Sequence, residues 1–245
     1  VVAGVMEHVE EAGIHSGDSS CFLPPVSLPE PVVERIREAA RALAGRLRVR
    51  GLMNVQFAVK DGEIFVIEVN PRASRTVPFV AKAKGERYAR MAARIMFGES
   101  LDAIGLEEKN IVGHHFAVKA PVFPFDRFPG VDVLLGPEMR STGEVMGRGD
   151  CFGEAFGKAM KGAGEIIPTK GRVFVSVKDN DKKYLPDLCS KLEKLGFQIY
   201  ATKGTAKALE KTDVNVKIIN KVLEGRPHIV DAILNKEIDM IINTT

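Results

Sequence analysis

The sequence is poor in cysteine, has little excess charge and contains no long apolar run. The three cysteines, Cys21, Cys151 and Cys189, are far apart and odd in number, which suits a reducing compartment and gives no metal-ligand spacing. A formal net charge of +3 over 245 residues is too small to indicate nucleic-acid binding. No apolar run reaches the roughly 18 residues that a membrane span requires, and no basic leader opens the chain. We therefore expect a cytoplasmic protein that binds neither nucleic acid nor a membrane.

The composition is that of a globular protein, with 45% hydrophobic and 27% charged residues. The length suffices for one large domain or two medium ones. The last residues, "EIDMIINTT", read as a buried strand that has no exit turn. We expect the domain to continue beyond Thr245 and the chain to be a fragment, truncated at both ends.

A change of texture near residue 164 predicts a first domain over 1–163 and a second, incomplete domain over 164–245. Apolar spacing and turn residues in the first part predict a strand at 1–9, a helix at 32–49, strands at 53–60 and 64–69, a helix at 76–98 broken near Gly85, an ordered connector over 105–150 and a short helix at 151–164. Strands and helices alternate in the second part, which is typical of a small parallel α/β domain.

The two strands around "KDGE" carry polar side chains toward their open ends. Glu68 and Asn70 lie two residues apart and therefore share a face, and Gln56 lies on the partner strand. A simple two-residue turn at Asp61-Gly62 would place Gln56 opposite Ile67, whereas an odd loop with a bulge would place it opposite Glu68. The hairpin signal leaves both registers open, and a metal site needs the second one.

These polar residues have two interpretations. They are either solvated side chains on an open sheet face, as charged residues mostly are, or a site for a metal and a phosphate. Hard oxygen ligands suit Mg²⁺, which is held by one or two carboxylates together with substrate phosphates. The neighbouring Arg72 and Arg75 suit phosphate oxygens.

Four segments resemble one enzyme family in order and spacing: "MEHVEEAGIHSGDSS", "RGLMNVQFAVK", "IEVNPRASRTVPFV" and "GPEMRSTGEVMG". They are similar to the ATP-grasp ligases, and more narrowly to the large subunit of carbamoyl-phosphate synthetases, over essentially the whole chain. The resemblance implies a mixed fold, α/β and α+β: the C-terminal part of the second ATP-grasp half, followed by a methylglyoxal-synthase-like domain. It also implies ATP-dependent phosphorylation of carbamate to carbamoyl phosphate, for pyrimidine and arginine biosynthesis.

The resemblance also implies roles for individual residues. Gln56, Glu68 and Asn70 match Mg²⁺ or Mn²⁺ ligands, and Arg72 and Arg75 match basic residues near the transferred phosphate and the carbamate. A nucleotide-contacting stretch, to which Gln56 and Glu68 also contribute, matches Gly13, Ile14, His15 and Ser16. From the sequence alone, the simpler interpretation of His15 is a capping or core histidine.

Ornithine binding is in doubt. Glu10 and Asp18 match acidic residues that hold ornithine in some members, but the third acidic position falls on Ala120.

The second domain carries a candidate anion site at "ATKGTA", between a strand and a helix. The simpler interpretation is an ordinary helix cap beside surface lysines. In the resembling domain this region binds nucleotide effectors such as UMP or IMP, and the positions that match it, or that lie on strand ends facing the same region, are Lys182, Thr202, Thr205, Lys221, Ser176, Asn243 and Thr244. The Gly-Gly-Asp loop of the lyase with this fold is replaced by "EGRPHIVD", which favours regulation over methylglyoxal synthesis.

The resemblance further implies a glutaminase small subunit as partner and an oligomer of such heterodimers. Two other functions stay open: a different ATP-grasp ligase, such as a biotin carboxylase, and a non-catalytic nucleotide-sensing module. The attached α/β domain argues against the first, and the intact metal and phosphate residues argue against the second. The fragment alone is expected to be inactive.

Overall fold

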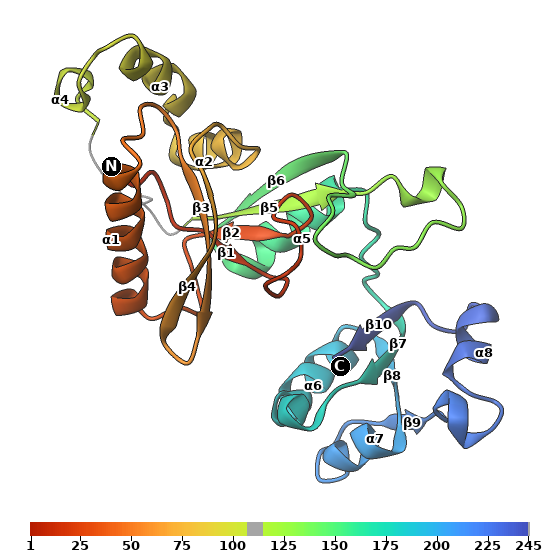
Figure 1. Cartoon of the computed structure of the whole chain (residues 1–245). Helices are drawn as coiled ribbons and strands as arrows, with labels where there is room; N and C mark the ends of the chain where they lie inside the picture. Colours follow the sequence, from red (N-terminus) through yellow and green to blue (C-terminus); the bar gives the residue numbers. More distant parts are fainter. Residues whose placement is uncertain (107–114, 245) are drawn as a thin grey trace. The chain divides into compact units, whose positions relative to one another are not determined.

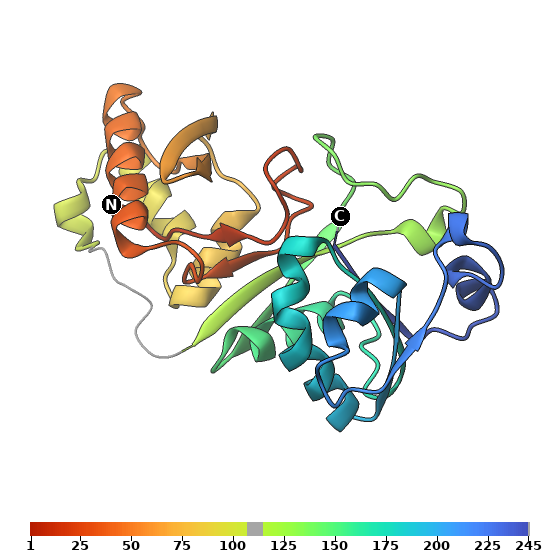
Figure 2. The same ribbon diagram turned by 90° about the horizontal axis from the view of Figure 1, so that it is seen from below.

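The computed structural model describes residues 1–106 and 115–244. The chain forms two compact units, Val1–Ile166 and Ile167–Thr245, and no sheet is shared between them (Figures 1 and 2). Unit 1 has two apolar clusters and unit 2 has one among the described residues. Among the described residues, no helix has both the length and the apolar character that crossing a membrane requires. The predicted connector over 105–150 includes residues 107–114, which lie outside the described part.

Unit 1 contains a four-stranded sheet, a separate two-stranded hairpin and several helices. Its elements, in chain order, are β1 (Glu7–His8), β2 (Cys21–Leu23), α1 (Glu30–Arg46), β3 (Asn54–Lys60), β4 (Glu63–Asn70), α2 (Thr76–Lys84), α3 (Tyr88–Met96), α4 (Leu101–Ile104), β5 (Phe116–Val122), η1 (Phe125–Arg127), β6 (Gly143–Gly149) and α5 (Phe152–Gly162). Helix α2 ends at Gly85, whose φ of 70° is the left-handed conformation that glycine adopts without strain. The predicted break at this glycine is confirmed.

The four-stranded sheet of unit 1 has the order β1-β2-β5-β6 and is antiparallel throughout. Side chains alternate across it, so the two faces belong to two different cores. On one face Phe22, Val118 and Ala120 pack against α5. On the other face Leu23 and Ala117 pack against residues of α2 and α3. This second face supports the segments that carry the candidate site.

Strands β5 and β6 correct the predicted connector over 105–150. The prediction was wrong there because β5 is buried on both faces and so shows no alternation, and because β6 is rich in glycine. Gly147 lies under α5, where an added Cβ would stand 2.1 Å from the carbonyl oxygen of Ala155. Glycine therefore allows this strand and helix to approach closely. The stretch 128–142 between η1 and β6 has no regular element, as expected of a connector.

The expected strand at 1–9 is also corrected. Only Glu7 and His8 form a strand, paired with Phe22 and Cys21. Among the described residues, none pairs with residues 1–6 as a neighbouring strand. Strand composition was therefore insufficient, because a strand also needs a partner.

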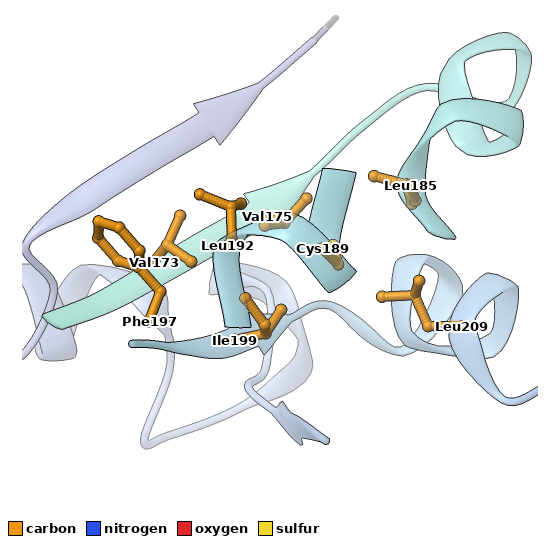
Figure 3. Close-up of a cluster of buried hydrophobic side chains, with 8 residues drawn as sticks. All are labelled: Val173, Val175, Leu185, Cys189, Leu192, Phe197, Ile199 and Leu209. Carbon is orange, nitrogen blue, oxygen red and sulfur yellow. The ribbon is translucent and has the colours of Figure 1, made fainter. Parts of the chain in front are cut away.

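Unit 2 is a four-stranded parallel sheet with the order β10-β7-β8-β9. The predicted alternation of strands and helices is confirmed. Its elements are β7 (Gly171–Ser176), η2 (Asp179–Tyr184), α6 (Leu185–Lys194), β8 (Phe197–Ala201), α7 (Lys203–Leu209), β9 (Val216–Ile218), η3 (Val222–Glu224), α8 (Ile229–Leu234) and β10 (Met240–Asn243). Figure 3 shows how α6 and α7 place Leu185, Cys189, Leu192 and Leu209 against the side chains of β7 and β8.

Candidate functional site

The β3–β4 hairpin combines the two features that the sequence left as alternatives. Its turn is the simple two-residue loop, with Lys60 opposite Glu63, and Asp61 and Gly62 both have positive φ (53° and 79°). A bulge further along restores the other register: Phe57 faces Val66, but Gln56 faces Glu68, so Ile67 is the extra residue. Gln56 therefore lies opposite Glu68 even though the turn is short.

The bulge gathers four oxygen-bearing side chains on one face of the hairpin. Asn54 faces Asn70 across the strands, two residues from the pair of Gln56 and Glu68. Residues two apart on a strand share a face, and so do residues directly opposite each other. The sequence analysis missed Asn54, although its position two residues before Gln56 indicates that the two side chains share a face. Its side-chain amide donates to the hydroxyl of Thr76 at 3.0 Å, which ties β3 to the start of α2.

The chemistry of this face suits a hard cation that receives most of its ligands from phosphate. It offers one carboxylate and three amide oxygens, the oxygen types that Mg²⁺ accepts. The described residues contain no group of three or more His, Cys, Asp and Glu side chains that would hold a metal by themselves. A metal held here would therefore depend on a bound nucleotide. Glu68 is exposed, whereas Gln56 and Asn70 are half-buried.

The two candidate arginines differ in how firmly they are held. Arg72 is exposed and its Nη1 donates to the carbonyl of Ala73 at 3.0 Å. Arg75 immediately precedes α2, and its Nη1 donates to Ser141, at 3.2 Å to the hydroxyl oxygen and 3.5 Å to the carbonyl oxygen. Arg75 is thus fixed by a residue 66 positions away in the sequence.

The predicted nucleotide-contacting stretch is a turn that the rest of unit 1 holds from two sides. The backbone N–H of His15 donates to the carbonyl of Gly136 at 2.8 Å. Lys119 Nζ donates to the carbonyl of Ser16 at 3.0 Å from the sheet beneath. The imidazole Nδ1 of His15 accepts from the backbone N–H of Gly17 at 3.0 Å, so the histidine stabilises its own turn.

Asp18 joins this turn to the loop before β6. Its carboxylate is fully buried and accepts the backbone N–H groups of Arg140 (2.7 Å) and Ser141 (2.8 Å). Burial alone would raise its pKa, but the hydrogen bonds from Ser141 and Arg140 outweigh burial and lower it. The carboxylate of Glu10 is likewise engaged, since it accepts the backbone N–H of Ser20 at 2.7 Å.

Titratable side chains lie around the buried Lys119, and the sequence analysis missed this cluster. Only 1% of Lys119 is exposed, and its ammonium lies 3.9 Å from the carboxylate of Glu144. Burial raises the pKa of Glu144, with Lys119 opposing, and burial together with the charge of Lys119 lowers the pKa of His8 to about 4. Ala120, next to Lys119, faces the apolar core at α5 and is fully buried.

A pocket of about 670 Å³ brings part of the predicted site together. Its walls come from α1, β3, α2 and α3, and they include Gln56, Ser16 and Glu10. Glu68, Asn70, Arg72 and Arg75 are not among the described residues that line it. Of the predicted metal and nucleotide residues, the pocket lining thus includes Gln56 and Ser16 but not the two arginines.

The predicted effector residues of unit 2 lie at the carboxyl edge of its parallel sheet. Asn243 pairs with Ser176, and the backbone N–H of Thr244 donates to the Ser176 carbonyl at 3.0 Å. Thr202 and Thr205 are buried, and the hydroxyl of Thr202 donates to that of Thr205 at 3.2 Å.

Two lysines add positive charge at this edge. The ammonium of Lys182 lies 2.6 Å from the carboxylate of Asp179 and 3.7 Å from where a Cβ of Gly204 would stand. Hydrogen bonding and charge from Lys182, and the charge of Lys221, lower the pKa of Asp179. The seven predicted effector residues therefore surround one edge of the sheet.

The chain matches two family models. Residues 1–104 match the carbamoyl-phosphate synthase L chain, ATP binding domain, and residues 185–245 match the MGS-like domain. The class of protein is thus an ATP-binding, ATP-grasp domain followed by a small parallel α/β domain.

Relatives match over the whole chain. It is 55% identical over 245 residues to the carbamoyl phosphate synthase large chain of Pseudomonas aeruginosa, and 58% identical over 244 residues to that of Pasteurella multocida. Over its whole length the chain is thus similar to the C-terminal part of carbamoyl phosphate synthase large chains. All of this chain is covered in both comparisons, but only 23% of each relative, so it spans about a quarter of their length.

Proposed function

We propose that this chain is the part of a carbamoyl phosphate synthase large chain that phosphorylates carbamate with ATP and responds to a nucleotide effector. The observation that carries the proposal is the bulged register that sets Gln56 opposite Glu68, with Asn70 on the same face. Asn54 bonds to Thr76, but no side-chain hydrogen bond of Gln56, Glu68 or Asn70 is found within the described part of the chain, whereas a nucleotide–metal complex would use their oxygens.

In this proposal Gln56, Glu68 and Asn70 hold Mg²⁺ or Mn²⁺, which when bound neutralises charge on the nucleotide phosphates. Arg72 and Arg75 orient the phosphoryl group and balance its charge during transfer, since phosphoryl transfer depends on positioning and electrostatics more than on a protein nucleophile. The turn of Gly13, Ile14, His15 and Ser16 contacts the nucleotide. The rest of the large chain and a glutaminase small subunit complete the enzyme, as an oligomer of heterodimers.

The effector site we propose lies at the carboxyl edge of unit 2. Backbone N–H groups, the hydroxyls of Thr202 and Thr205 and the ammonium groups of Lys182 and Lys221 suit the phosphate of UMP or IMP. Asn243 and Thr244 border the same edge. Ornithine is less well served, because Glu10 and Asp18 already accept backbone hydrogen bonds and Ala120 faces an apolar core.

The test is ATP formation from carbamoyl phosphate and ADP with Mg²⁺, the reverse of the proposed step. It uses the whole large chain that carries these residues. Glu68→Gln should lower the rate at least tenfold, about the scale of one lost electrostatic contact in the transition state. Glu63→Gln is the matched control, because Glu63 is also exposed on β4 but lies at the turn, 3.8 Å from Arg35. Equal losses in both variants would count against a metal role for Glu68.

A sensor without catalysis is the second candidate, and unit 2 motivates it. Titration calorimetry with UMP and with IMP would measure binding, with Lys182→Ala as the test variant. Lys191→Ala is its control, since Lys191 is an exposed lysine of α6 in a comparable ion pair, 2.7 Å from Asp187. Effector binding that depends on Lys182, in a large chain with no metal-dependent ATP formation, would favour the sensor.

A further inference from the structure

Ser141 connects three segments of unit 1 that are distant in the sequence. It lies just before β6 and is 4% exposed. Its backbone N–H donates to Asp18 at 2.8 Å, and its hydroxyl donates to the carbonyl of Gly17 at 3.0 Å. The same hydroxyl oxygen accepts from Nη1 of Arg75 at 3.2 Å. One small side chain thus contacts both the nucleotide-contacting turn and a candidate phosphate-binding arginine.

The hydroxyl of Ser141 has two acceptors beside it, the carbonyl of Gly17 and the carboxylate of Asp18, whose pKa a side-chain hydrogen bond from Ser141 lowers. A serine hydroxyl has one proton and two lone pairs. Its single proton goes to one of these two acceptors, both on the 17–18 turn, and a lone pair of its oxygen accepts from Arg75. A hydrogen bond from a charged guanidinium is stronger than one between neutral groups. Arg75 is otherwise an exposed, flexible side chain, so this contact restricts where its remaining N–H groups point.

The two loops that meet at Ser141 also pack closely along their length. The backbone N–H of His15 donates to Gly136, and a Cβ added at Gly17 would stand 2.9 Å from the sulfur of Met139. The turn that receives the serine proton is therefore itself held in place. The anchor of Arg75 is a rigid one, which a positioning contact requires.

We propose that Ser141 is a positioning residue that orients the guanidinium of Arg75 toward the phosphoryl group of carbamoyl phosphate. The inference rests on the proposed function and adds to it a residue that touches neither substrate nor metal. It also assigns a reason for the buried Asp18: its carboxylate fixes the backbone from which Ser141 acts.

The test uses the whole large chain and the same reverse reaction, with Ser141→Ala and Ser141→Cys as variants. Cysteine keeps the volume but accepts hydrogen bonds weakly, so it covers the case in which alanine fails to fold. Both should lower kcat/KM for carbamoyl phosphate roughly 10- to 100-fold, the scale of a misplaced catalytic group. Thr142→Ala is the neighbouring control, because Thr142 is exposed and its only hydroxyl contact among the described residues is a 3.5 Å one to Val122.

Two readouts separate positioning from general loosening. Positioning through Arg75 lowers kcat and raises KM for carbamoyl phosphate, whereas a loosened nucleotide turn raises only KM for ADP. In an Arg75→Ala background, the effect of Ser141→Ala should shrink markedly, because the group that it orients is gone. An equal fold-loss in both backgrounds, or a change confined to KM for ADP, would overturn the inference and leave the proposed function standing. No ATP formation by the wild type would overturn both.

Discussion

Replacing Asp18 with asparagine should lower the free energy of unfolding of unit 1. Asp18 is 0% exposed, and each carboxylate oxygen accepts one backbone N–H, from Arg140 and from Ser141. Asparagine keeps one oxygen but turns an NH₂ group toward the other backbone donor. One charge-assisted hydrogen bond is lost and a buried N–H is left unpaired, which together lower the free energy of unfolding by about 1–3 kcal/mol.

Far-ultraviolet circular dichroism in urea is the suitable assay, because the chain has no tryptophan to report by fluorescence. The transition of unit 1 should move to lower urea, while that of unit 2 stays in place. Asp126→Asn, on the exposed η1, should change stability by no more than about 0.5 kcal/mol. If Asp18→Asn unfolded at the same urea concentration as wild type, the buried carboxylate would not be holding the loop before β6.

The pH dependence gives the same prediction a sign. The pKa of Asp18 is lowered in the folded state, because the hydrogen bonds from Ser141 and Arg140 outweigh the effect of burial. The carboxylate therefore stabilises the fold above the unfolded-state pKa of 3.8, and this contribution is lost as the pH falls further through the folded-state pKa. The difference between wild type and Asp18→Asn should accordingly be constant near neutral pH and shrink in strong acid.

Three further predictions concern unit 1. His8 has a folded-state pKa of about 4 against 6.5 when unfolded, so the unfolded state binds more protons between these two values. The free energy of unfolding should therefore decrease as the pH is lowered from 6.5 to 4, by about 3 kcal/mol in total. His8→Gln should remove this slope in urea titrations, whereas an unchanged slope would assign it to other groups. Gly147→Ala should lower the free energy of unfolding by about 1–3 kcal/mol or more, because the added Cβ meets the backbone of α5. Gly153→Ala is the control and should lower it far less, because its Cβ meets nothing within 4 Å. The melting temperatures of the two variants test the difference. Cys151, which is exposed, should react with a maleimide in the native state, whereas Cys21, whose pKa burial raises to about 12, should not, as mass spectrometry of the labelled peptides would show.

The elements that could be predicted are those specified by local sequence. The helical spacing over 32–49 gave α1, and Gly85 gave the break between α2 and α3. Alternating strands and helices predicted the parallel sheet of unit 2, because its first three strands, β7, β8 and β9, are each followed by helical segments that return the chain. These signals lie within a few residues of the features that they predict.

The elements that were missed depend on contacts between distant segments. Strand β5 contains Lys119, which no sequence rule places in a core. It is buried because Ser16 and Glu144, from other segments, surround its ammonium. Strand β6 resembled a connector in sequence because it is rich in glycine. Two of its glycines, Gly147 and Gly149, leave room for α5, which follows it in the chain. Likewise, no local pattern joins Asp18 or Arg75 to Ser141, more than 60 residues away.

At the candidate metal face, the sequence left one question open, namely which of two registers pairs β3 with β4. Period-two alternation placed Glu68 and Asn70 on one face of β4, and the same rule puts Asn54, which the prediction missed, on one face of β3 with Gln56. Whether the two pairs meet depends only on register, because a shift of one residue turns a strand's side chains to the other face. The Asp61-Gly62 turn alone would have separated them, and the bulge at Ile67 brings them together. Bulges concentrate next to active sites because they re-aim side chains in this way. The extra residue at Ile67, a departure from regular pairing that no turn motif indicated, is therefore the structural reason that Glu68 lies opposite Gln56.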